Sequence, residues 1–142
     1  MELTAEQWRT FFTIASRHIR GTLKSEVNEP TAPLRADFIK SYCAWTSHDR
    51  LGYDTLYWTL PLAVEKDLQE NGLRDGGMWR EPIPYNDIAH VIIPAEYTED
   101  YHVDEKWIFW SHTQDIAGLS KLLDEASIPH KLHETFLELK LY

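Results

Sequence analysis

Seven histidines are the residues of this sequence whose types best suit metal or acid–base chemistry. His102 and Asp104 would lie on one side of an extended segment, and His90 and His112 come from neighbouring predicted strands. A zinc site needs three or four ligands that converge at about 2 Å, yet the chain has no CxxC, HExxH or HxxxH pattern. We therefore expect surface or hydrogen-bonded histidines, no metal and no other cofactor.

Three shorter patterns carry reactive side chains. Residues 47–49 are Ser-His-Asp, the residue types of a catalytic triad, but adjacent side chains diverge and a turn is expected. Cys43 has apolar neighbours and is typical of a small buried hydrophobe. Residues 75–77, Asp-Gly-Gly, lack the context of a nucleotide-binding loop. These patterns do not predict a catalytic residue, and we expect a protein that is not an enzyme.

An acidic stretch between Pro94 and Lys106 interleaves carboxylates with tyrosines. Carboxylates attract a cationic partner over long range, and tyrosines supply rigid contact area. The spacing does not match a calcium-binding EF-hand loop, and a solvated loop between two strands remains an alternative. Trp79 is a second candidate anchor or a lid over the core edge. The predicted partner-binding residues are Trp79, Glu96, Tyr97, Glu99, Asp100, Tyr101, Asp104 and Glu105.

The net charge of −9 disfavours nucleic acid as a partner. Residues 1–25 carry four basic and two acidic groups, a net charge of +2. The remaining residues hold 10 of the 14 basic and 21 of the 23 acidic groups, a net charge of −11. This acidic body suits a basic protein partner, or it serves only solubility.

The length of 142 residues is typical of one domain, residues 1–142, and 43% hydrophobic residues supply its core. A single cysteine excludes an intramolecular disulfide framework. The first residues have no basic region followed by an apolar run, and no stretch approaches about 18 consecutive apolar residues. We therefore expect a cytoplasmic protein with neither signal peptide nor membrane span.

In the N-terminal half, residues 4–7 form a capping box that starts an amphipathic helix ending near residues 21–24. Residues 25–33 read as a loop, and residues 34–45 fit either a helix or a strand. Residues 53–60 predict a strand, and a helix would follow from Pro61 to the Asn-Gly stop at 71–72. The first helix buries Trp8, Phe11, Phe12, Ala15 and Ile19.

The C-terminal half predicts the order β-β-α-β-β. A strand at 88–93 precedes the acidic loop at 95–105, and the unbroken apolar run 107–110 predicts a strand covered on both faces. A helix capped by Thr113 and a closing hairpin at 130–142 follow. The expected fold is α+β, a small, mainly antiparallel sheet with the N-terminal helix and a C-terminal-half helix packed on it. The buried stripe of the second helix is Ile116, Leu119, Leu122 and Leu123.

The C-terminal half contains the segment from Pro84 to Pro94, a helix containing Gly118 and Leu119, and Ile-Pro-His at 128–130 before a final strand. With these features it resembles small uncharacterised bacterial proteins, some of which are similar to immunity proteins that neutralise toxins delivered between competing bacteria. The resemblance implies a small, acidic, cofactor-free protein of the cytoplasm, and it implies no catalytic residues.

The leading hypothesis is an intracellular inhibitor that binds and occludes a cognate protein, such as a toxin enzyme with a basic active-site surface. The first alternative is a small enzyme whose site is built from scattered residues, with His48, His90, His102 and His112 as candidates. The second alternative is an acidic mimic of nucleic acid, which needs carboxylates spaced like phosphates over one face.

Overall fold

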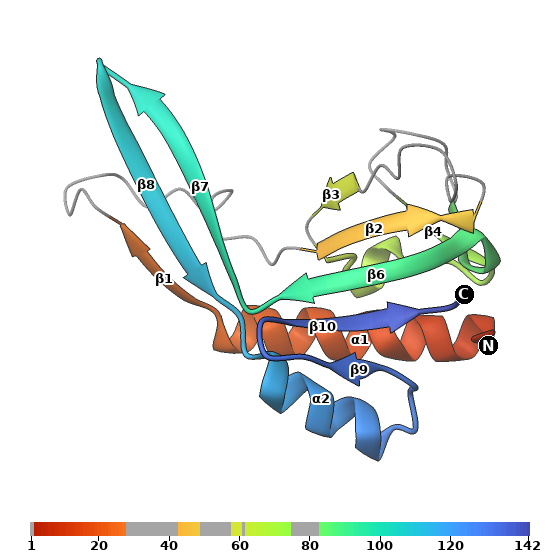
Figure 1. Cartoon of the computed structure of the whole chain (residues 1–142). Coiled ribbons are helices and arrows are strands. Elements are labelled where there is room, and N and C mark those ends of the chain that lie inside the picture. Colours follow the sequence, from red (N-terminus) through yellow and green to blue (C-terminus); the bar gives the residue numbers. More distant parts are fainter. Residues whose placement is uncertain (1, 28–42, 49–57, 61, 75–82) are drawn as a thin grey trace.

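The computed structural model describes residues 2–27, 43–48, 58–60, 62–74 and 83–142 (Figure 1). Trp79 and most of the ambiguous segment 34–45 lie outside these residues. The helices are α1 (Ala5–Thr22), η3 (Glu65–Asp67), η4 (Tyr85–Asp87) and α2 (Ile116–Glu125), of which η3 and η4 are 3₁₀ helices. The strands are β1 (Lys24–Val27), β2 (Cys43–Ser47), β3 (Trp58–Leu60), β4 (Gly72–Leu73), β5 (Ile83–Pro84), β6 (Ile88–Pro94), β7 (Glu96–Val103), β8 (Lys106–Thr113), β9 (Lys131–Leu132) and β10 (Phe136–Lys140).

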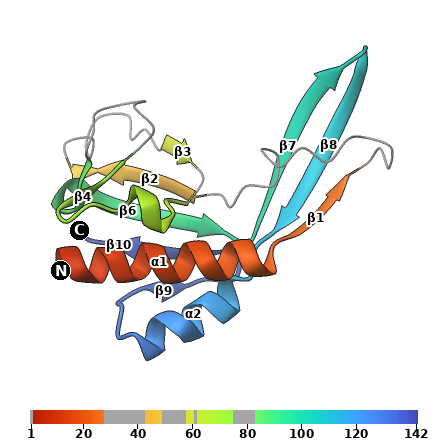
Figure 2. The ribbon, with the colours of Figure 1, turned by 180° about the vertical axis from the view of Figure 1, so that it is seen from behind.

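The described strands form three antiparallel sheets. The largest has the order β3-β2-β6-β10-β9, the second has the order β1-β8-β7, and β4 pairs with β5. Both α-helices lie on the same side of the five-stranded sheet, as the view from behind shows (Figure 2). The predicted α+β fold, with one N-terminal helix and one in the C-terminal half, is confirmed.

Helix α1 forms as its sequence predicts. The Thr4 side chain accepts a hydrogen bond from the Gln7 N–H, and the Gln7 side chain accepts one from the Thr4 N–H, which completes the capping box. All five residues of the predicted apolar stripe are buried. The rings of Trp8, Phe11 and Phe12 pack together, with centroids 5.0 to 6.0 Å apart. This aromatic cluster is the α1 side of the core.

Residues far apart in the chain share one core. Leu3 from the N-terminus, Ile93 from β6, Leu119 and Leu123 from α2, and Leu139 from β10 belong to the same buried cluster. The closing hairpin, β9 and β10, is confirmed, and the alternation of side chains along β10 buries Leu137 and Leu139. None of the described helices is long and apolar enough to cross a membrane.

Two local predictions in the N-terminal half are wrong. Residues 25–27 of the predicted loop belong to β1, because they pair with β8. In the described residues 62–74 the predicted helix is reduced to η3, since Leu68 then bridges to Leu73 and the Gln69 N–H donates to the Gly72 carbonyl, which reverses the chain. Tertiary pairing thus overrides a loop-like composition in the first place and helical spacing in the second.

The prediction that Thr113 caps α2 is also wrong. Thr113 is the last residue of β8 and pairs with both Lys24 and Glu96. Asp115 is the cap instead, because its side chain accepts a hydrogen bond from the Gly118 N–H at 3.1 Å. Three residues of the predicted stripe are buried, and Leu122 is half-buried.

The largest corrections concern residues 95–113. The acidic segment is not a loop but the strand β7, which pairs with β8 over its whole length, from Glu96 opposite Thr113 to Val103 opposite Lys106. From Ile88 onward, three strands therefore precede α2, not two, and the short strand β5 lies before them. The apolar run 107–110 is not covered on both faces, since Trp107 is 57% and Phe109 44% exposed. His90 and His112 also lie on strands of different sheets, β6 and β8.

Candidate functional site: a projecting hairpin

The hairpin formed by β7 and β8, here called the hairpin arm (residues 96–113), projects away from the helices and the five-stranded sheet (Figure 1). Strand β1 pairs with the base of β8, from Lys24 opposite Thr113 to Val27 opposite Trp110. Beyond Trp110, the described part of the arm continues as a two-stranded ribbon. The arm is therefore fixed at its base and presents its outer half to the surroundings.

One face of the arm is exposed throughout. Residues directly opposite one another in an antiparallel ladder point to the same face, and the direction alternates along each strand. The residues of this outer face are Glu96, Thr98, Asp100, His102, Trp107, Phe109, Ser111 and Thr113, and all of them are exposed.

Two large aromatic side chains lie next to each other on this outer face. Trp107 and Phe109 belong to the four large hydrophobic residues that are exposed among the described residues. The His102 ring lies against the Trp107 ring, with centroids 4.9 Å apart, and Asp100 is directly opposite Phe109. Exposed aromatic residues gathered on a projecting element are typical of a contact surface.

The opposite face of the arm anchors it to the rest of the protein. Trp110 and His112 are buried, and Tyr97 stacks on His112 with ring centroids 4.5 Å apart. The His112 Nδ1 atom lies 2.7 Å from the Ser25 hydroxyl of β1. His112 therefore has a structural role at the base of the arm.

The arm is strongly acidic. Its 18 residues contain five carboxylates and one lysine, Lys106, so its net charge is −4 with histidine neutral. This negative charge lies on the same ribbon as the exposed Trp107 and Phe109. Such a surface attracts cationic groups and repels anionic ones. The five carboxylates are Glu96, Glu99, Asp100, Asp104 and Glu105.

The arm turns at two residues with positive φ. Asp104 has φ 50° and Glu105 has φ 63°, and Val103 pairs with Lys106 on either side of them. A left-handed conformation at both positions is typical of the two-residue hairpin turn of type I′. Glycine and asparagine favour this conformation, whereas glutamate adopts it at a cost. The turn residues here are Asp104 and Glu105, so the sequence lacks the Asn-Gly or Asp-Gly pair that would signal a hairpin.

The structure places the predicted partner-binding residues on different parts of the hairpin arm. Glu96 and Asp100 lie on the exposed outer face, whereas Tyr97 lies on the opposite face and is half-buried. Asp104 and Glu105 form the exposed turn. In the ladder, Glu99 is opposite Trp110 and Tyr101 is opposite Ile108. Trp79 lies outside the described residues.

Sequence reasoning missed Trp107 and Phe109 as candidate contacts. The unbroken apolar run that contains them predicts a strand covered on both faces. Their exposure follows only from the lack of a second layer over this strand, which the sequence does not record. The signal that was available lies in β7, where Tyr97, Thr98, Tyr101 and Val103 all favour a strand.

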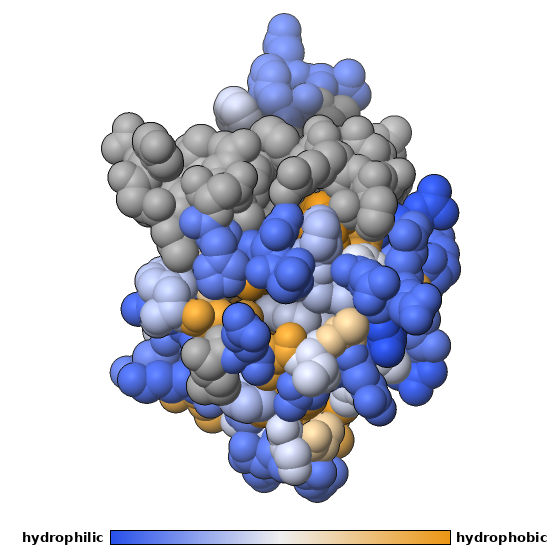
Figure 3. Space-filling view, turned by 90° about the vertical axis from the view of Figure 1, so that its right-hand side faces the viewer, coloured by the Kyte–Doolittle hydropathy of each residue, from blue (hydrophilic) through white to orange (hydrophobic). Residues whose placement is uncertain are grey.

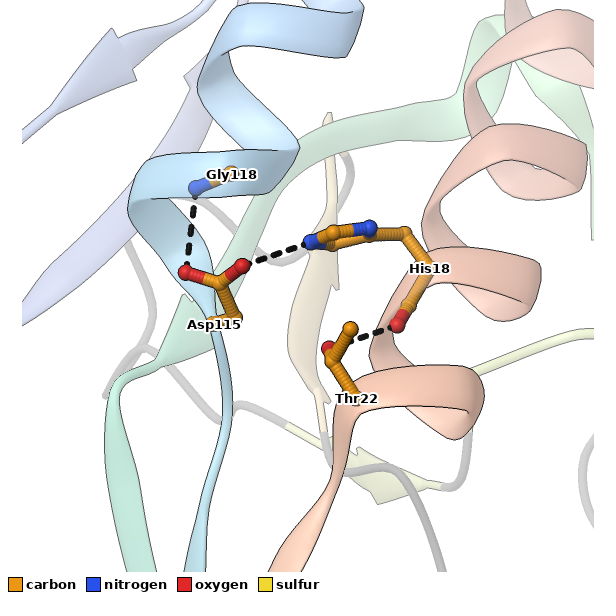
Figure 4. A network of polar contacts seen from close by, with 4 residues as sticks. All are labelled: His18, Thr22, Asp115 and Gly118. Carbon is orange, nitrogen blue, oxygen red and sulfur yellow. Dashed lines mark hydrogen bonds and ion pairs between the residues drawn. The ribbon is translucent and has the colours of Figure 1, made fainter.

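A second group of polar residues joins the two helices (Figure 4). The His18 Nε2 atom of α1 lies 2.9 Å from Asp115 Oδ2, while Asp115 Oδ1 caps α2 through the Gly118 N–H. The hydrogen bond from Gly118, and then that from His18, hold the pKa of Asp115 below its usual value. This network ties the start of α2 to the end of α1.

A third group surrounds Glu138 on β10. His90 Nε2 lies 2.6 Å from its Oε2 atom, and His133 Nε2 lies 2.9 Å from its Oε1 atom. Burial opposes ionisation of Glu138, but the hydrogen bonds from His133 and His90 outweigh it, and the pKa lies below the usual value. Both histidines thus contact the same carboxylate, one at each oxygen of Glu138.

The four histidines proposed for an enzyme do not come together. His90 belongs to the five-stranded sheet, His102 and His112 to the hairpin arm, and His48 is exposed after β2. Within the part of the chain that the structure describes, no three His, Cys, Asp or Glu side chains are arranged to hold a metal ion. Hydrophilic residues dominate the end of the molecule shown in Figure 3, where hydrophobic residues form only small separate patches outside the grey atoms.

Comparisons with known proteins found no relative of this chain. No protein-family model matches the chain. No curated protein matches its sequence, and no solved structure matches its fold. The hairpin arm, with its exposed aromatic residues and its net negative charge, is therefore the feature on which a functional proposal rests.

Proposed function

We propose that this chain is a cytoplasmic protein-binding inhibitor of the immunity type, which occludes a cognate toxin by placing its hairpin arm against a basic surface. The observation that carries the proposal is the pair Trp107 and Phe109, exposed side by side on a projecting, acidic ribbon. Aromatic side chains in this setting become anchors when a partner buries them.

The two properties of the arm have separate physical roles in this proposal. The aromatic pair would supply most of the binding free energy, because burying large apolar side chains removes them from water. The carboxylates would speed the encounter with a cationic surface, and they would disfavour association of two copies of the arm. A projecting ribbon can also enter a groove, as an inhibitor of an active site must.

Co-expression with the protein encoded by the adjacent gene tests the proposal. We expect a stable complex and protection of growth from that protein. The double variant Trp107→Ser/Phe109→Ser should weaken the complex by at least about thirtyfold, as expected for the loss of a binding hot spot. Binding of the purified variants, measured by calorimetry, gives the affinities.

Leu132→Ser is the matched control, because Leu132 on β9 is 44% exposed, the same fraction as Phe109. This variant should bind like the unmodified protein. Circular dichroism of each variant establishes that the fold is retained. The proposal fails if neither a complex nor protection is observed, and the assignment to the arm fails if both variants bind equally well.

A further inference from the structure

Strands β9 and β10 separate at a proline. Their ladder joins Leu132 to Leu137 and Lys131 to Glu138, and the next hydrogen-bonded pair would be Pro129 with Lys140. Proline has no N–H to donate, so the ladder ends there. The His133 N–H donates to the Phe136 carbonyl. Because the backbone groups of β10 point alternately to its two neighbouring strands, the Lys140 N–H points to the same side as the Phe136 carbonyl. It is therefore directed toward Pro129, where the two strands separate.

A cavity of about 340 Å³ opens where the two strands separate. Its volume falls in the lower part of the range of small-molecule sites, roughly 300 to 1,000 Å³. The residues that line it are Pro129, His130, Lys131, Glu138, Lys140 and Leu141.

Two lysines line this cavity, Lys131 from β9 and Lys140 from β10. Among the residues that the structure describes, no carboxylate forms an ion pair with Lys131 or Lys140. The Lys140 ammonium lies 4.8 Å from the centroid of the Tyr142 ring, which restricts its position.

The carboxylate in the cavity wall is already engaged. Each oxygen of Glu138 faces an imidazole, Oε2 that of His90 and Oε1 that of His133. His130 is fixed as well, with Nε2 at 2.7 Å from the Ser120 hydroxyl and Nδ1 at 2.8 Å from the Ile128 carbonyl. The lysine ammonium groups are therefore the charged donors that remain for a ligand.

We infer that the cavity between β9 and β10 binds a small oxyanion of the phosphate or carboxylate type, held by the Lys131 and Lys140 ammonium groups and the Lys140 N–H. Charge-assisted hydrogen bonds of this kind are the stronger ones in proteins. The site is separate from the hairpin arm, and its test does not depend on a protein partner.

Nuclear magnetic resonance titration of the whole chain with inorganic phosphate, and separately with acetate, tests this site. Saturable shifts should centre on the amides of Lys131, Glu138, Lys140 and Leu141. Tighter binding of phosphate would identify a phosphate-type ligand, and tighter binding of acetate a carboxylate. Each of Lys131→Gln and Lys140→Gln should weaken binding about tenfold, and the double variant should abolish it.

Lys121→Gln is the control, because Lys121 is exposed on α2 and does not line the cavity. This variant removes one positive charge, as each single cavity variant does, and should leave binding unchanged. The inference is overturned if neither anion produces saturable shifts at millimolar concentration. It is also overturned if Lys121→Gln weakens binding as much as the cavity variants do, since nonspecific attraction would then explain the shifts.

Discussion

Gly118 is the residue at which the packing of α1 on α2 allows no side chain. A Cβ atom there would overlap Asp115 Oδ2 and would lie 2.7 Å from His18 Nε2. Both atoms belong to the network that caps α2 and joins it to α1. Glycine is required here because the side chains of Asp115 and His18 leave no room for a Cβ atom. Its backbone conformation does not require glycine, because it sits within the first turn of an ordinary helix.

Gly118→Ala should be less stable than Gly21→Ala by about 1 kcal/mol in urea unfolding, because displacement of Asp115 removes the cap of α2 while both variants gain the helix propensity of alanine. The variant should also raise the pKa of Asp115 toward its usual value, which a carboxyl titration by nuclear magnetic resonance measures. Gly21→Ala is the control, since its Cβ would meet nothing within 4 Å and alanine favours a helix. Equal stability changes in the two variants would contradict the packing argument.

At the scale of elements, the hairpin arm combines a fully paired ladder with an unfavourable turn. Glu105 has φ 63° although glutamate resists the left-handed conformation. Glu105→Gly should therefore stabilise the protein by about 0.5 to 1 kcal/mol, measured by thermal or urea unfolding. Lys106→Gly should destabilise it, because the adjacent position is a strand residue that glycine weakens. A loss of stability in Glu105→Gly would show that the turn has another conformation.

At the scale of the whole molecule, the proposed function predicts that the charge of the arm steers the approach of the partner. Reversal of Glu99, Asp100 and Asp104 to lysine should slow association with the proposed partner at low salt, with less effect at high salt. Stopped-flow measurements at several salt concentrations give the rates. Because the reversal also changes the total charge, a control is needed in which the same charge is changed elsewhere.

The control reverses Glu70, Glu125 and Glu134, which are exposed and lie outside the arm. Both triple variants change the net charge from −9 to −3, since each replaces three negative with three positive groups. If steering is local to the arm, only the arm variant slows association strongly. An unchanged rate in the arm variant would exclude the arm from the interface.

The elements that the sequence predicted well are those whose signals are local. The capping box and the helical spacing of apolar residues lie within α1 itself, and the alternation of leucines lies within β10. The acidic segment was predicted wrongly because its many charges suggested a loop, whereas pairing with β8 makes it a strand. Helix η3 ended early for the same reason, since Leu68 finds its partner in Leu73.

The sequence by itself determined the α+β class, the two helices, the closing hairpin and the acidity of residues 96–105. Only the tertiary structure decided that Trp107 and Phe109 are exposed, that His90 and His133 meet on Glu138, and that Pro129 opens a cavity. The physical reason is that exposure and side-chain pairing depend on which layers cover a strand. That covering is set by contacts between residues far apart in the chain, and no local pattern records it.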